Sequence, residues 1–138
     1  MTTSQKIQDG MLSEFELFGD WTDKYQHIID LGKSLPPLPN KWKTDKWKVS
    51  GCQSNVWLYP ELREGRLHFY ADSDAIITKG LMALILRPVQ DQLPEDIEKN
   101  NFDLIGKLGL KEHLSPTRAN GLDAVVRMIR NYSKTFSK

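Results

Sequence analysis

The chain has 138 residues, of which 39% are hydrophobic and 27% are charged, and its formal net charge is only +1. This length is sufficient for one domain with a substantial core, so we expect a single domain over residues 1–138. The balanced charge gives no general indication of a nucleic-acid partner, and no stretch approaches the roughly 20 apolar residues that span a bilayer.

The first 15 residues, MTTSQKIQDGMLSEF, lack the apolar core of a secretory signal. The chain has one cysteine and therefore cannot form an internal disulfide. Both features are typical of a protein in the reducing cytosol, so we expect a cytoplasmic location.

The N-terminal third is predicted to be helical. Ile7, Met11 and Phe15 share one face at helical spacing. A second helix is expected after Asp20, which is a suitable N-cap, and Gly32 fits the position just past its end. The apolar positions of this second helix are Trp21, Tyr25, Ile28 and Ile29.

Residues 31–48, LGKSLPPLPNKWKTDKWK, interrupt this pattern because three prolines in the segment forbid a regular helix. Within it, residues 41–48 interleave lysines with two tryptophans. Such a stretch can bind single-stranded nucleic acid, but exposed lysines also keep a sheet edge from pairing with another chain. The second interpretation is favoured, and a protein-docking role is a third, because the stretch leads directly to the cysteine.

The centre of the chain predicts three antiparallel strands, at residues 47–50, 54–61 and 66–71. In the second, Val56 and Leu58 alternate with Trp57 and Tyr59. The only cysteine, Cys52, is expected at the tip between the first two strands.

The remainder is predicted to be helical again. An apolar stripe ends at Pro88, two short helical turns follow at residues 94–100 and 103–109, and a last helix begins at Ser115-Pro116. The whole pattern predicts an α+β fold with a small three-stranded antiparallel sheet packed with helices. The stripe consists of Ile77, Leu81, Leu84 and Ile85, and the core face of the last helix of Leu122, Val125, Val126 and Ile129.

Metal and phosphate sites are not indicated. One cysteine and three scattered histidines, His27, His68 and His113, do not form the close ligand set of a zinc or iron–sulfur site. No glycine-rich loop of a phosphate-binding type is present. We therefore expect no metal site and no cofactor bound by this chain.

Cys52 remains the best candidate for chemistry. Its neighbours Gly51, Gln53 and Ser54 are small or polar, and lysines lie just upstream, a setting in which a thiol can ionise and be reached. A cysteine buried for packing is the alternative. A thiolate can attack a carbonyl, reduce a peroxide or take up a sulfur atom, and the residue pattern does not choose among these reactions.

Three segments, occurring in this order, resemble the SufE/CsdE family of sulfur-acceptor proteins: GCQSNVW at 51–57, LHFYADSDAIITKGLMALIL at 67–86 and LGLKEHLSPTRANGLDAVV at 108–126. The upstream stretch YQHIIDLGKSLPPLP also fits. The resemblance implies a carrier that accepts persulfide sulfur from a pyridoxal-phosphate cysteine desulfurase of the SufS or CsdA type and stimulates that enzyme. The sulfur would then pass to a scaffold on which iron–sulfur clusters are built.

By the same resemblance, Cys52 is the acceptor, and Asp74 and Arg118 are the other motif residues closest to function. The implied fold is similar to the IscU-type scaffold, without its cluster-binding cysteines. The implied protein is not a stand-alone enzyme, and the pyridoxal phosphate belongs to its partner. The stretch before the motif is richer in lysine and tryptophan than the family pattern, which bears on which desulfurase is recognised.

A thiol-dependent enzyme, such as a cysteine hydrolase or peroxidase, is the alternative function. A hydrolase needs a histidine base beside the thiolate, and no histidine lies near Cys52 in the sequence. Arg118 is predicted in the first turn of a helix, where a cation is unfavourable, and this favours a functional role. Gly80 and Gly121 also interrupt helices, for which function and close packing are equally good explanations.

Overall fold

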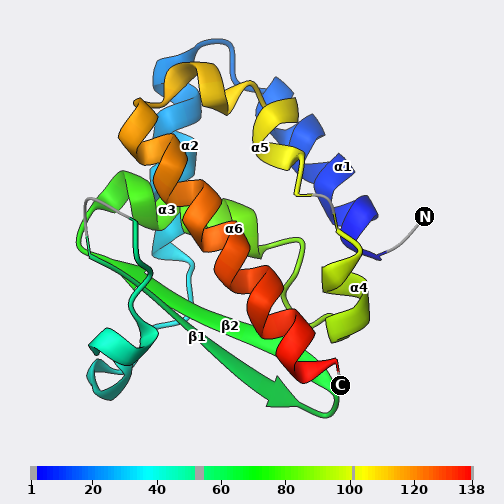
Figure 1. Cartoon of the computed structure of the whole chain (residues 1–138). Helices are drawn as coiled ribbons and strands as arrows, with labels where there is room; N and C mark the ends of the chain where they lie inside the picture. Colours follow the sequence, from blue (N-terminus) through cyan, green and yellow to red (C-terminus); the bar gives the residue numbers. More distant parts are fainter. Residues whose placement is uncertain (1–2, 52–54, 101, 138) are drawn as a thin grey trace.

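The computed structural model describes residues 3–51, 55–100 and 102–137, and its helices and strands follow the predicted order (Figure 1). The predicted α+β class is confirmed. In chain order the elements are α1 Thr3–Glu16, α2 Trp21–Lys33, the 3₁₀ turns η1 Asn40–Trp42 and η2 Asp45–Trp47, β1 Val56–Arg63, β2 Arg66–Ser73, α3 Ile76–Leu86, α4 Pro94–Glu98, α5 Leu104–Lys107, η3 Leu110–His113 and α6 Pro116–Phe136.

The start of α2 agrees with the sequence, but its end does not. The Asp20 side chain accepts a hydrogen bond from the Asp23 backbone N–H at 2.9 Å, as expected of an N-cap. The helix continues through Lys33, so Gly32 lies inside its last turn and does not follow its end. The prediction for Gly32 was therefore wrong.

Close packing between α2 and α3 explains both Gly32 and Gly80. A Cβ atom at Gly80 would lie 2.2 Å from the Ile28 carbonyl oxygen, and one at Gly32 would lie 2.8 Å from the Gly80 nitrogen. No larger side chain fits at either position without moving a backbone. The two glycines thus allow the two helices to touch. Of the two explanations for Gly80, function and close packing, the structure supports close packing.

The hairpin of β1 and β2 directly follows the segment that contains Cys52 in the chain. The strands pair antiparallel from Val56 opposite Ser73 to Arg63 opposite Arg66. Glu64 and Gly65, with φ angles of 52° and 80°, form the tight turn between them, a conformation that matches strand twist in two-residue hairpin loops. The predicted alternation is confirmed, because Val56 and Leu58 are buried whereas Trp57 and Tyr59 are half-buried. On β2, Leu67, Phe69 and Ala71 are buried in the same way.

The third predicted strand, at residues 47–50, does not form in the part of the chain that the structure describes, where the sheet has two strands. Trp47 belongs to η2, and the chain turns at Gly51, where φ is +92°. The stretch between these turns is too short for a strand. It makes one isolated bridge, Lys48 to Trp57, and one hydrogen bond from the Val49 N–H to the Val56 carbonyl at 2.8 Å.

Helix α6 crosses the middle of the molecule, with the hairpin at one end and α1, α4 and α5 along one side (Figure 1). Leu122, Val125 and Ile129 of its predicted core face are buried, and Val126 is half-buried. The largest side chains that are almost fully enclosed come from every part of the chain: Phe69, Met11, Ile28, Leu58, Leu67, Leu81, Met82, Leu84, Leu86, Ile97, Leu110 and Ile129.

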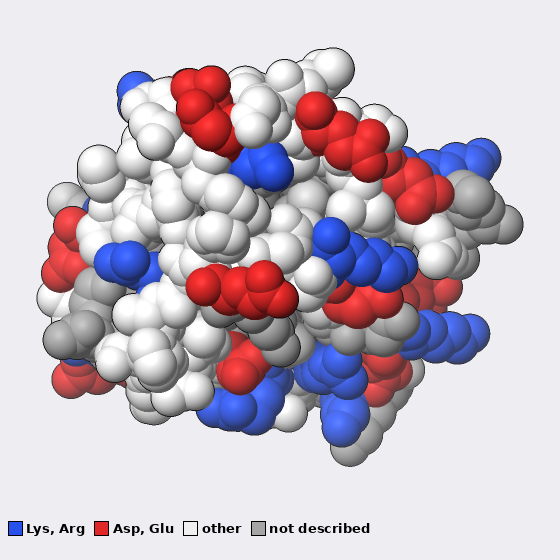
Figure 2. Space-filling model, turned by 90° about the horizontal axis from the view of Figure 1, so that it is seen from above, with Lys and Arg blue, Asp and Glu red and all other residues white. Residues whose placement is uncertain are grey.

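The surface agrees with the balanced composition. Seen from above, acidic and basic side chains are intermixed and separated by uncharged areas (Figure 2). Across the described ranges, no helix has both the length and the apolar character needed to cross a membrane.

Candidate functional site

The predicted acceptor Cys52 and its neighbours Gln53 and Ser54 lie outside the described residues, so their placement stays a prediction. The residues on either side, Gly51 and Asn55, are described. They show where the connection, here the segment of residues 51–55, begins after η2 and where it ends before β1.

Gly51 begins the connection in the left-handed region of backbone space, with φ at +92°. Residues other than glycine rarely adopt this angle. A Cβ atom there would lie 3.6 Å from the Cβ of Ala124 on α6, an ordinary contact distance. The backbone angle, and not a lack of space, therefore requires glycine here, and the connection begins directly against α6.

Asn55 ends the connection and is bound by Asp74. The Asn55 backbone N–H donates to Oδ1 of Asp74 at 3.2 Å, and its side-chain amide donates to Oδ2 at 2.9 Å. The Asp74 backbone N–H donates in return to the Asn55 carbonyl at 3.3 Å. Asp74 therefore fastens the end of the connection to the chain just beyond β2, which gives this predicted site residue a concrete structural role.

Asp72 lies two residues earlier and binds two lysines. Its carboxylate is 2.7 Å from Nζ of Lys43 and 3.3 Å from Nζ of Lys79, and it accepts a hydrogen bond from the Ser73 backbone N–H. Burial alone would raise the pKa of Asp72, but the hydrogen bonds from Lys43, Ser73 and Lys79 and the charge of Lys79 outweigh it and hold the pKa below its ordinary value. This ionised group ties the segment before the connection to α3.

Arg118 is the third residue of α6, as predicted. Its backbone N–H donates to the Ser115 hydroxyl at 3.2 Å, which caps the helix. Its side chain is exposed and makes no hydrogen bond or ion pair within residues 3–51, 55–100 and 102–137. Six residues of helix, about 9 Å of rise, separate Arg118 from Ala124, which contacts the Gly51 position. The structure thus brings the pairs Asp74–Asn55 and Gly51–α6 together, and Arg118 lies further along the same helix.

Two residues near the connection were missed by the sequence analysis. Asn55 could have been noticed as a turn-forming residue directly before an alternating strand pattern. Ile76, only two residues after Asp74, is 69% exposed. Ile76 does not share the helix face of the predicted apolar stripe of α3. Its position on another face could have identified it as a surface residue from the sequence alone.

The three histidines make contacts in other parts of the fold. His27 Nε2 is 3.0 Å from Oε1 of Glu14, His68 Nε2 is 3.4 Å from Oδ1 of Asp91, and the His113 ring stacks on Trp21 at 3.7 Å. Across the described residues, no group of three or more His, Cys, Asp or Glu side chains is placed to hold a metal ion.

Comparison with known proteins decides the family. Residues 9–133 match the family described as "SufE: Fe-S metabolism associated domain". The chain belongs to the SufE family. This confirms the predicted resemblance and connects the chain to iron–sulfur metabolism.

Two curated relatives support the assignment. A SufE-like protein of Rhizobium meliloti (strain 1021) is 38% identical over 128 residues, covering 89% of this chain and 91% of the relative. A SufE-like protein of Rhizobium etli is 37% identical over 131 residues, covering 91% and 88%. Both are named as uncharacterized, so they support the family and not a specific reaction.

A solved structure supports the fold. The solution structure of a hypothetical protein from Thermus thermophilus superimposes with a TM-score of 0.78 and covers 94% of each chain. Its sequence identity is 18%, so this likeness concerns the arrangement of helices and strands alone.

Proposed function

We propose that this SufE-family protein accepts persulfide sulfur on Cys52 from a pyridoxal-phosphate cysteine desulfurase, stimulates that enzyme and passes the sulfur to an iron–sulfur scaffold. One observation carries the proposal. Both ends of the connection that contains the only cysteine are held by motif segments of the family, with Asp74 bonded to Asn55 and α6 packed against Gly51. Asp74, one of the two residues expected near function besides the cysteine segment, therefore contacts a residue that flanks this segment, and Arg118 lies further along the helix that packs against the other flanking residue.

The transfer is an exchange between sulfur atoms. The Cys52 thiolate attacks the terminal sulfur of the persulfide on the desulfurase, and a bond forms between the two sulfurs. The sulfur–sulfur bond of the donor breaks, and the donor cysteine leaves as a thiolate. Cys52 then holds the persulfide, and the transferred sulfur keeps its oxidation state, so the step needs no external oxidant or reductant. Delivery to the scaffold repeats the exchange with an acceptor thiolate as the attacking group.

The local fold suits this exchange. The hydrogen bond from Val49 to Val56 closes the base of the connection, and the bonds between Asn55 and Asp74 fix its far end. A loop held at both ends can enter a partner's site and loses less conformational freedom on docking than an unrestrained one. Gln53 and Ser54 are proposed as hydrogen-bond donors to the thiolate or persulfide.

We propose that the Arg118 guanidinium pairs with a carboxylate of the partner enzyme or stabilises the Cys52 thiolate. The guanidinium stays charged at every physiological pH and can bind a carboxylate through two parallel hydrogen bonds. Its exposed side chain leaves it available for such a contact. We further propose that the protein works in the cytosol, where a thiol remains reduced.

The positions of the histidines in the sequence favour a carrier over a hydrolase. A cysteine hydrolase needs an imidazole beside its thiolate, and no histidine lies near Cys52 in the sequence. A sulfur carrier needs no general base of its own, because the partner enzyme generates the persulfide.

The proposal is tested by stimulation of a desulfurase. Desulfurases of the SufS and CsdA types are each assayed for sulfide release from cysteine with reductant present, alone and with increasing amounts of this protein. At least one enzyme is expected to be stimulated by the wild type and not by Cys52→Ser. Equal stimulation by wild type and Cys52→Ser would contradict a covalent role for this residue.

A further inference from the structure

Three lysines just before the connection are exposed on the surface. They are Lys41, Lys46 and Lys48, here called the lysine rim. The fourth lysine of this stretch, Lys43, binds Asp72, but no carboxylate lies within ion-pair distance of the rim lysines in the described parts of the chain. The one acid of the stretch, Asp45, is itself exposed, so the stretch presents a net positive surface.

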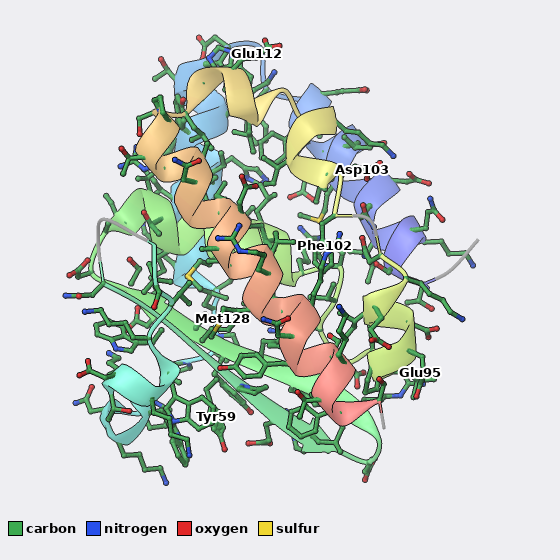
Figure 3. The ribbon with its side chains drawn as sticks, viewed as in Figure 1. Tyr59, Glu95, Phe102, Asp103, Glu112 and Met128 are labelled. Atoms are coloured by element: carbon green, nitrogen blue, oxygen red, sulfur yellow. The ribbon has the colours of Figure 1, made fainter. Side chains whose placement is uncertain are left out.

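The segment that carries the lysine rim, residues 40–48, packs against β1 and α6. The Trp42 and Trp47 rings pack on Tyr59 of β1, with centroids 4.3 and 4.8 Å away, and Trp47 also approaches Tyr132 of α6 at 6.4 Å. In Figure 3, Tyr59 lies on the side of the hairpin next to the turns of residues 40–47. The bond from Lys43 to Asp72 adds a further attachment. The backbone that carries the lysines is therefore attached to β1, β2 and α6 at these points.

The same packing also argues against a nucleic-acid partner. Single-stranded nucleic acid binds by stacking its bases on open aromatic faces. Here the two tryptophans are half-buried and pack on Tyr59, and a lysine amine already lies over each ring, with Lys41 Nζ 5.0 Å from the Trp42 ring and Lys46 Nζ 4.9 Å from the Trp47 ring. A base would have to displace these lysines before it could stack on either ring.

The rim lies within reach of any partner that engages the thiol. Lys48 precedes Cys52 by four residues and Lys46 by six, so at most about 20 Å of extended chain separates Lys46 from the cysteine. A standard protein interface buries about 800 Å² on each partner, a disc of roughly 16 Å radius. Lys48, at most about 14 Å of extended chain from Cys52, lies inside an interface of this size centred on the cysteine, and Lys46 lies within it or near its edge.

We propose that the lysine rim docks on an acidic protein surface beside the active-site entrance of the desulfurase, and that it sets the rate and choice of docking rather than the sulfur chemistry. This inference rests on the proposed function. Opposite charges on two docking surfaces speed the encounter by factors of about 10 to 1,000, and salt weakens the effect. The rim is thus expected to act on the concentration of carrier that the enzyme needs and not on its maximal rate.

The test compares two double charge reversals in the stimulation assay. The rim variant is Lys46→Glu/Lys48→Glu. The control is Lys6→Glu/Lys99→Glu, which changes the net charge equally at exposed positions on α1 and after α4, on the other side of the molecule from residues 40–47 (Figure 1). The probe is a desulfurase of the SufS or CsdA type that the wild type has been shown to stimulate. The half-saturating concentration of carrier and the maximal rate are measured at low and high salt.

The rim variant is expected to need about tenfold more carrier at low salt, with a maximal rate within about twofold of wild type, and to approach the wild type at high salt. The milder Lys46→Gln/Lys48→Gln should show a smaller shift in the same direction. Thermal unfolding of each variant confirms that the fold is retained. The control should remain within about twofold of wild type throughout.

Three outcomes would overturn the inference. Equal shifts in the rim and control variants would show that only overall charge matters. A loss of maximal rate at unchanged half-saturation would assign the lysines to the chemistry. Tight, rim-dependent binding of a fluorescent oligothymidylate, without any change in desulfurase stimulation, would assign the rim to nucleic acid. The proposed function fails separately, when no desulfurase responds to the wild type at all.

Discussion

Asp74 binds Asn55 through both of its carboxylate oxygens, at 3.2 and 2.9 Å, and its own backbone N–H returns a bond to the Asn55 carbonyl. The two residues are 19 positions apart and lie on either side of the hairpin. Their contact fixes the end of the connection that contains Cys52. An exposed aspartate thus anchors the residue that follows the Cys52 segment.

Asp74→Ala is expected to release this end of the connection. Both side-chain bonds to Asn55 are lost, and because the pair is exposed, the free energy of unfolding should fall by only about 1 kcal/mol or less. Alkylation of Cys52 by iodoacetamide should become severalfold faster. Asn55→Ala should show the same direction with a smaller effect, since only the side-chain amide bond is lost and the backbone N–H of residue 55 can still donate to Oδ1 of Asp74. Unchanged alkylation in both variants would show that Asp74 does not restrain the cysteine.

Arg118→Ala is expected to separate stability from function. A cation in the first turn of α6 opposes the helix dipole, so its removal should leave the melting temperature unchanged or slightly raised. Desulfurase stimulation should fall severalfold, and Arg118→Lys should restore only part of it if the contact is two-pronged. Arg127→Ala, another exposed arginine of α6, serves as the matched control. Normal stimulation by Arg118→Ala, or simple unfolding, would contradict this role.

Gly80→Ala is expected to destabilise the fold, because the new Cβ would meet the Ile28 carbonyl at 2.2 Å and force α2 and α3 apart. The cost should be at least about 1–3 kcal/mol, measured by urea unfolding. Gly10→Ala is the control, since nothing lies within 4 Å of its Cβ position inside α1, and it should stabilise by up to about 1 kcal/mol. Equal effects of the two substitutions would refute the packing account.

Asp72 predicts a dependence of stability on pH. Its pKa is lower in the folded than in the unfolded chain, where 3.8 is its ordinary value, so the unfolded chain binds more protons in the interval between them. Its contribution is therefore complete above pH 3.8 and is lost as the pH falls through the folded pKa. Unfolding of wild type and Asp72→Asn is compared from neutral to acid pH. The wild-type advantage should shrink in the acid range, and an advantage independent of pH would contradict the ion-pair account.

Local patterns were sufficient to predict most elements. The N-cap Asp20, the alternating Val56 and Leu58, and the proline that follows Ser115 each act within a few residues, so their outcome can be predicted from the sequence. The family assignment followed from three motifs in a fixed order and is confirmed by the match over residues 9–133.

The errors came from contacts between distant segments. Gly32 was expected to end α2, because the sequence does not reveal that Gly80 of α3 lies against it. The strand at residues 47–50 was predicted from its residue types, whereas Trp47 is held in a 3₁₀ turn by its packing on Tyr59. The hydrogen bonds between Asp74 and Asn55 likewise depend on the hairpin, which brings these two residues together although they are 19 positions apart in the sequence.

The central claim is that Cys52 receives sulfur, and the intact mass of the protein tests it most directly. The protein is incubated with cysteine and desulfurases of the SufS and CsdA types, separated from the enzyme without reductant, and weighed by mass spectrometry. With at least one of these enzymes, wild type should gain the mass of one or more sulfur atoms, reductant should remove the gain, and Cys52→Ser should show none. A wild-type protein that stays unmodified with every desulfurase, or a Cys52→Ser protein that gains sulfur equally, would contradict the account.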